Sequence, residues 1–121
     1  MKLRWMILTV ASMALPAAAG ASPGSCFLGV DGHVYLDGPC NIDSYKDGSF
    51  SIGAGEKMRS RYFAYVNIDP DTKKADASWN GVAGENHAHD PLGTLTRTGG
   101  CWNNARAKVC AWKPGSRPAT F

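Results

Sequence analysis

The chain has 121 residues, and its 13 lysines and arginines against 10 aspartates and glutamates give a formal net charge of +3. Two of these positive charges, Lys2 and Arg4, lie in a predicted leader, so its removal leaves about +1 (+3 minus 2) on a single domain of about 100 residues. A nearly neutral domain lacks the positive field that attracts nucleic acids or anionic membrane surfaces. We therefore predict no nucleic-acid partner.

Residues 1–21 show the order of features that is typical of a secretory signal peptide. A positively charged start precedes the apolar run Trp5–Leu15, and small residues then fit a cleavage site near Ala19 or Ala21. The run is shorter than the roughly 20 apolar residues that a membrane span requires, and no later segment is a better candidate. We expect a periplasmic or secreted protein without a membrane span.

The rest of the chain alternates between short apolar stretches and turn-forming residues, with 14 glycines and seven prolines in the whole sequence. Seven strands are predicted, at about Cys26–Val30, His33–Leu36, Ser49–Ile52, Arg61–Ile68, Ala75–Trp79, Leu92–Arg97 and Lys108–Trp112. Turns are predicted at Asp31-Gly32, Asp37-Gly38-Pro39, Asp47-Gly48, Asp69-Pro70-Asp71, Asp90-Pro91 and Gly99-Gly100.

Short strands at regular intervals predict an all-β fold, a small antiparallel meander that forms a barrel or a sandwich and is braced by two disulfides. We assign residues 22–113 to a single secreted β domain. Residues 114–121 contain two prolines and no periodic pattern, and we expect them to form a flexible C-terminal tail.

An even number of cysteines in a short exported chain indicates disulfides, and the four are Cys26, Cys40, Cys101 and Cys110. No C-x-x-C motif suggests a zinc ribbon or a redox pair. Of the three possible connectivities, we favour Cys26–Cys40 and Cys101–Cys110, because each pair brackets a predicted hairpin. A pairing between the two hairpins stays open. Each local bridge would contribute roughly 3 kcal/mol in the chain-entropy model.

The favoured pairing of the last two cysteines also predicts a packing contact. In a hairpin with Cys101 opposite Cys110, Gly99 lies opposite Trp112. The indole could then cover a glycine that has no side chain of its own.

The segment "GENHAHDP", residues 84–91, contains two of the three histidines. On a strand, His87 and His89 would point the same way with Glu85 beside them, an arrangement that can bind zinc or copper. A third ligand would have to come from elsewhere in the fold. Alternatively, the segment is a polar connection whose histidines bond to the backbone. A hydrolase that pairs one histidine with a distant carboxylate also stays open.

Tyr45 lies in the turn-rich stretch "NIDSYKDG", where we expect an exposed aromatic that could anchor a partner. The sequence contains no nucleophile elbow, phosphate-binding glycine loop or H-E-x-x-H motif. We therefore predict a small, non-enzymatic binding or inhibitory module that acts on an envelope or periplasmic protein or a cell-wall component. The alternatives are a metal-binding protein that uses His87 and His89, and a small periplasmic hydrolase.

Overall fold

The structure, a computed structural model, describes residues 21–56 and 58–121, so the predicted leader lies outside it except for Ala21. The described residues form eight strands and no helix. The strands are β1 (Ala21–Val30), β2 (His33–Ser44), β3 (Phe50–Ile52), β4 (Ala64–Ile68), β5 (Ala75–Trp79), β6 (Asp90–Thr98), β7 (Cys101–Asn103) and β8 (Ala107–Trp112). None of the described residues belongs to a helix with the length and hydropathy that a membrane crossing requires.

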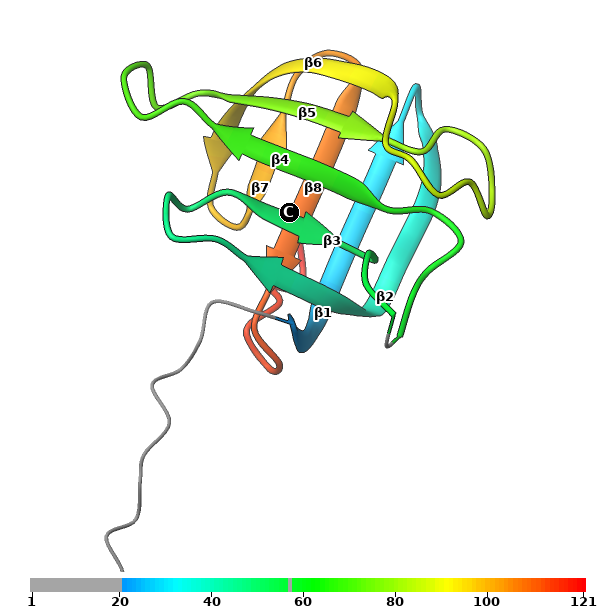
Figure 1. The fold of residues 1–121 in the computed structure, drawn as a ribbon. Helices are drawn as coiled ribbons and strands as arrows, with labels where there is room; N and C mark the ends of the chain where they lie inside the picture. Colours follow the sequence, from blue (N-terminus) through cyan, green and yellow to red (C-terminus); the bar gives the residue numbers. More distant parts are fainter. Residues whose placement is uncertain (1–20, 57) are drawn as a thin grey trace, which may run out of the picture.

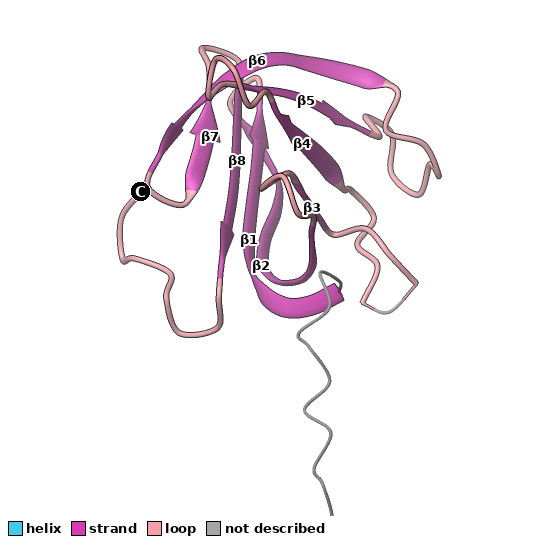
Figure 2. Ribbon diagram, turned by 60° about the vertical axis from the view of Figure 1, so that its left-hand side comes forward, coloured by secondary structure: helices cyan, strands magenta, loops and turns pink. Residues whose placement is uncertain are grey.

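The eight strands close into an antiparallel barrel in which each strand pairs with the next. Closure comes from β8, which pairs with β1 from Ser25↔Trp112 to Val30↔Ala107. Strands β3 to β6 pass across β1, β2 and β8, and the sheet wraps round one interior (Figures 1 and 2). The predicted all-β meander is confirmed, and the barrel replaces the sandwich because the two outer strands of the meander pair with each other.

Strand β2 contains one predicted turn that the structure does not form. Asp37, Gly38 and Pro39 lie inside this strand, where Gly38 pairs with Cys26 and Pro39 with Ser25. Gly38 takes a φ of 135°, which glycine adopts at little cost, so the strand continues through the segment. The hairpin turn at Asp31-Gly32 is confirmed, with φ values of 52° and 78° that suit a type I′ turn.

Several strand boundaries also differ from the prediction; β4, for example, begins at Ala64 and not at Arg61. The Asp-Pro pair at 90–91 begins β6 and is not a turn, and Pro91 is paired with Ser78. The three-residue strand β7 was not among the seven predicted strands, because so short a segment shows no alternation. The predicted hairpin with Cys101 opposite Cys110 is nevertheless confirmed, and β7 is its first strand.

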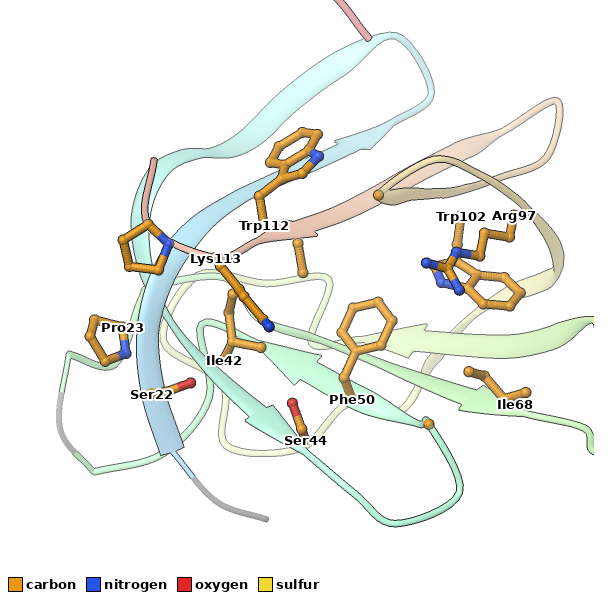
Figure 3. A pocket seen from close by; sticks show the side chains of 14 residues that line it. Ser22, Pro23, Ile42, Ser44, Phe50, Ile68, Arg97, Trp102, Trp112 and Lys113 are labelled. Carbon is orange, nitrogen blue, oxygen red and sulfur yellow. The ribbon is translucent and has the colours of Figure 1, made fainter. Parts of the chain in front are cut away.

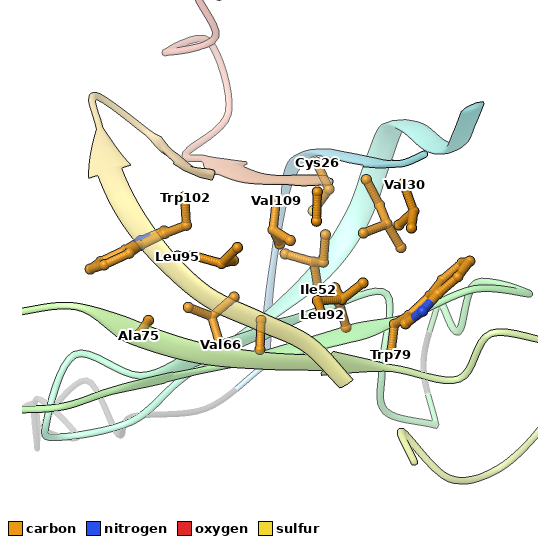
Figure 4. Close-up of a cluster of buried hydrophobic side chains, with 14 of the residues drawn as sticks. Cys26, Val30, Ile52, Val66, Ala75, Trp79, Leu92, Leu95, Trp102 and Val109 are labelled. Carbon is orange, nitrogen blue, oxygen red and sulfur yellow. The ribbon is translucent and has the colours of Figure 1, made fainter. Parts of the chain in front are cut away.

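The core lies between two buried tryptophans, Trp102 toward one end of the barrel and Trp79 toward the other (Figure 4). Between them the inner faces of the strands contribute aliphatic side chains, including Leu28, Ile52, Val66, Leu95 and Val109. These residues follow the period of two that places alternate side chains inside a barrel.

Two register shifts close the end near Trp79. Between β1 and β2, Leu28 pairs with Leu36 and Gly29 with Val34, which leaves Tyr35 as an extra residue. Its ring packs on that of Trp79, with centroids 4.6 Å apart. Between β5 and β6, the extra residue is Leu92, which is buried in the core. Each bulge therefore turns a large side chain toward the same end of the barrel.

Both favoured disulfides are present. Cys26–Cys40 lies within the main core, and Cys101–Cys110 joins directly opposed residues of β7 and β8. Disulfides of this kind are typical of proteins from oxidising compartments.

Trp112 covers the second disulfide from outside, but the glycine beneath its ring differs from the expected one. The indole lies over Gly100, whereas Gly99 has open space around it. The hydrogen bond from Ala111 N to Gly100 O, 3.0 Å long, brings this glycine under the ring.

Residues 113–121 form no strand but do contact the barrel. Arg117 pairs with Asp37 at 2.6 Å, and its guanidinium lies 5.2 Å from the Trp112 ring centre. The Phe121 ring packs 5.1 Å from that of Phe27. These contacts describe one static arrangement. The expected flexibility of residues 114–121 therefore stays a prediction.

Candidate functional site

One end of the barrel holds a cavity of about 590 Å³, which we call the cup. In an antiparallel meander, the first residues of odd-numbered strands and the last residues of even-numbered strands meet at the same end. The cup is lined in this way, by residues at the starts of β1 and β3, by Trp102 of the short strand β7, and by the ends of β2, β4, β6 and β8 (Figure 3). Its volume lies within the range of about 300–1,000 Å³ that is usual for small-molecule sites.

The wall of the cup is mostly apolar. Its apolar side chains include Ile42, Phe50, Ile68, Trp102 and Ala111, and each belongs to the inward-facing series of its strand. Phe50 and Ile68 are half-buried, because beyond them no further layer of side chains fills the barrel. The wall is therefore the outermost layer of the core, left uncovered at this end.

The floor of the cup is the next inward-facing layer. Each strand contributes to this layer the residue two positions deeper in the barrel than its wall residue. These residues are all completely buried, and they are Cys40, Ile52, Val66, Leu95 and Val109. The cup is thus a depression above a close-packed core and not a channel, and the layer of Trp79 and Leu92 closes the opposite end.

Two cationic side chains belong to the cup. Arg97 is paired with Trp102 across β6 and β7, and Lys113 follows directly after β8 and reaches toward the middle of the cup (Figure 3). No aspartate or glutamate is among the described residues that line it. Within the described residues, the carboxylate salt bridges involve Arg106 and Arg117, and none reaches these two cations.

The described lining of the cup provides no catalytic constellation. Its side-chain hydroxyls are those of Ser22 and Ser44, and the lining residues that the structure describes include no histidine or carboxylate to serve as a general base. Its chemistry is that of an apolar surface with two positive charges at hand.

The histidine segment lies at the other end of the barrel, in the connection between β5 and β6. Glu85, His87 and His89 are all exposed, and neither histidine lies on a strand, so the alternation that would align them does not apply. Within residues 21–56 and 58–121, no group of three or more His, Cys, Asp or Glu residues could hold a metal ion. The structure therefore does not bring Glu85, His87 and His89 together as a ligand set, and zinc or copper binding there stays a prediction.

A buried asparagine holds this connection in place. Asn80 accepts a hydrogen bond from Phe63 N at 3.1 Å, and its amide donates to Arg61 O at 2.9 Å and Val82 O at 3.1 Å. It is fully buried. Asn80 was not among the predicted site residues, and one of the alternatives left open by the sequence was that the histidines bond to the backbone here. The sequence signal for this role was the asparagine directly after the predicted strand, in "SWNG", where turn-forming residues often bond to the backbone.

Tyr45 lies at the cup end, in the turn between β2 and β3, and is 49% exposed. Its N–H donates to Ser49 O at 2.9 Å, which closes the turn. Asp47, in the same turn, accepts a hydrogen bond from Ser49 N at 2.9 Å, and this bond lowers the pKa of its carboxyl group, with the Ser49 hydroxyl adding to the effect. Tyr45 is thus available to a partner, and its binding role stays a prediction.

The cup was also not predicted from the sequence, although its residues carry a readable signal. They are the terminal inward-facing positions of their strands, and they become neighbours only when β8 meets β1.

Comparison with protein-family models, curated proteins and solved structures finds no match to the chain.

Proposed function

We propose that this protein is a small exported binding module without catalytic activity, and that it receives its ligand in the cup. The observation that carries the proposal is the asymmetry of the barrel. One end is closed by Trp79, Leu92 and Tyr35, whereas the other presents an apolar cavity of about 590 Å³ to solvent. Apolar surface left open to water is unfavourable unless a ligand covers it, and large exposed apolar patches mark binding sites.

The rigidity of the cup supports binding. Its wall residues lie on strands of a closed sheet, and Cys26–Cys40 links two of those strands below the wall. A site that is already shaped in the free protein loses little conformational entropy when a ligand binds. The absence of a general base from the described lining favours binding over hydrolysis.

The partners proposed for an exported domain are components of the cell envelope, which means an envelope or periplasmic protein or a cell-wall component. The predicted leader and the two disulfides support this location. An inhibitory role is one form that such binding could take.

The proposal is tested with Nile red, an uncharged dye whose emission rises in apolar surroundings. We expect one dye molecule to bind per barrel. Ser44→Trp should abolish binding, because Ser44 belongs to the cup wall and an indole there would occupy the cavity. Thr98→Trp is the matched control, since Thr98 is an exposed residue of β6 that does not line the cup.

Backbone amide shifts recorded during the dye titration locate the site. Shifts that concentrate at the strand ends lining the cup support the proposal. A wild-type protein that does not bind the dye, or a Ser44→Trp variant that binds it as well as Thr98→Trp does, would refute it.

A further inference from the structure

We propose that the ligand of the cup is a single-chain amphiphile with an anionic head group. This inference rests on the proposed function, because it names the chemical class of ligand for the same site. The apolar chain packs against the wall, and the head group binds Arg97 and Lys113.

The distribution of charge argues for an anion. The described lining of the cup contains two positive side chains and no negative one, so these side chains would repel an apolar molecule with a positive head. Arg106 and Arg117, by comparison, are paired with Asp31 and Asp37 on the outside of the barrel. The described residues provide no carboxylate salt bridge for Arg97 or Lys113, so both can accept an external anion.

The placement of the two cations argues for a head group at the mouth. Arg97 and Lys113 are exposed, whereas Trp102 and the floor residues below them are buried. Arg97 is also held in position, because its Nε donates to Gly99 O at 2.9 Å and leaves the terminal nitrogens free. A guanidinium anchored in this way can offer its remaining N–H groups to a carboxylate or phosphate.

The shape of the cup argues for a single apolar chain. Ile42, Phe50 and Ile68 line one side, and Trp102 and Ala111 line another, above a floor without polar side chains. An apolar segment that enters between these walls would replace water on both, while its charged end stays near the mouth. A sugar or a polar peptide segment would find few hydrogen-bond acceptors here, since the neutral polar side chains of the described lining are the Ser22 and Ser44 hydroxyls and the indole N–H groups of Trp102 and Trp112.

The test compares four probes that share one alkyl chain: octanoate, octyl phosphate, octanol and octylamine, each displacing Nile red. We expect octanoate or octyl phosphate to bind at least about tenfold more tightly than octanol, with octylamine weakest, and added salt to reduce the difference. The first two probes also distinguish a carboxylate from a phosphate head group.

Variants assign the head-group site. The double variant Arg97→Gln/Lys113→Gln should lower affinity for the preferred anion about tenfold more than it lowers affinity for octanol. Lys46→Gln is the matched control, because Lys46 lies in the turn at the same end of the barrel but does not line the cup.

The outcomes separate the two proposals. If octanol displaces the dye as well as both anions do, or if octylamine binds best, the cup is a binding site and the anionic amphiphile is refuted. If the double variant binds the anions normally, the assignment of the head group is wrong. If the protein binds neither the dye nor any probe, the proposed function fails as well.

Discussion

A single buried amide determines the geometry of the corner that contains both exposed histidines. Asn80 bonds to backbone groups at Arg61, Phe63 and Val82, and thereby ties the end of β5 to the segment before β4. Its Nδ2 also lies 3.4 Å from Glu85 O. Arg61 O also accepts a hydrogen bond from Gly84 N, and Val82 O accepts one from Glu85 N. Phe63 N, by contrast, is paired with Asn80 alone among the described residues.

We expect Asn80→Ala to destabilise the protein by about 1–3 kcal/mol, because it leaves the buried Phe63 N–H without a hydrogen-bond partner. Urea unfolding measures this change. Asn86→Ala, in the same loop but exposed, is the control and should change stability by less than about 0.5 kcal/mol. Equal effects of the two substitutions would show that Asn80 does not hold the corner.

The turn between β2 and β3 provides a second prediction at this scale. Hydrogen bonds from Ser49 lower the pKa of Asp47, so its folded pKa lies below that of the unfolded chain, which is about 3.9. The stability that this carboxylate contributes is therefore present above the unfolded pKa and is lost as pH falls through the folded value.

Carbon-13 NMR of the Asp47 carboxyl should give a midpoint below about 3.9 in the folded protein. The same measurement in denaturant should return the ordinary value. A folded midpoint at or above the denatured one contradicts the hydrogen bond from Ser49 N.

At the scale of elements, the hairpin of β7 and β8 carries a close contact between Gly100 and Trp112. A β-carbon on Gly100 would lie 2.7 Å from Cδ1 and 3.1 Å from Cε2 of the indole, so this position excludes any larger residue. The neighbouring Gly99 has a φ of 60°, and no atom lies within 4 Å of a β-carbon built there. Glycine is therefore favoured at this position by the backbone conformation and not by lack of space.

We expect Gly100→Ala to cost about 1–3 kcal/mol, the usual range for overpacking. Gly99→Asn should cost less, because asparagine tolerates a positive φ and the space is open. Denaturant midpoints measure both, and near-ultraviolet circular dichroism reports the displaced indole. If Gly100→Ala is the milder change, the indole does not rest where the structure places it.

The bulges explain why the two ends of the barrel differ. Leu36 and Gly93 occupy inward-facing positions of β2 and β6. In a strand without a bulge, their neighbours Tyr35 and Leu92 would therefore point outward. The extra residue in each strand changes this alternation and directs a large side chain to the end near Trp79. No such insertion occurs where the strands line the cup.

At the scale of the whole molecule, the two disulfides brace a barrel that the hydrogen-bonded sheet already closes. Each joins neighbouring strands, over separations of 14 and 9 residues. Both therefore restrict the unfolded chain only locally, and neither creates the β8–β1 closure.

We expect Cys101→Ala/Cys110→Ala to lower the free energy of unfolding by roughly 3 kcal/mol and to keep a β-type circular dichroism spectrum. Urea unfolding and the far-ultraviolet spectrum measure the two quantities. A variant that is unfolded without denaturant would show that closure of the barrel depends on this bridge.

The Cys26→Ala/Cys40→Ala variant should also lose roughly 3 kcal/mol and keep a β-type spectrum. A further loss of stability is expected because these two sulfurs lie within the main core.

The sequence by itself determined the local features. Three correct predictions depend on alternation and turn chemistry within a few residues. They are the boundaries of the strand Ala75–Trp79, the turn at Asp31-Gly32 and the pairing of Cys101 with Cys110. These signals are local because side-chain direction on a strand and φ at a turn are properties of neighbouring residues.

Only the tertiary structure decided that the sheet closes, which end is filled and where a ligand can enter. The cup brings together residues as distant as Ile42 and Lys113, and Asn80 bonds to groups 17 and 19 positions away. No short stretch of sequence encodes these meetings, because they follow from the register of eight strands and from the pairing of β1 with β8.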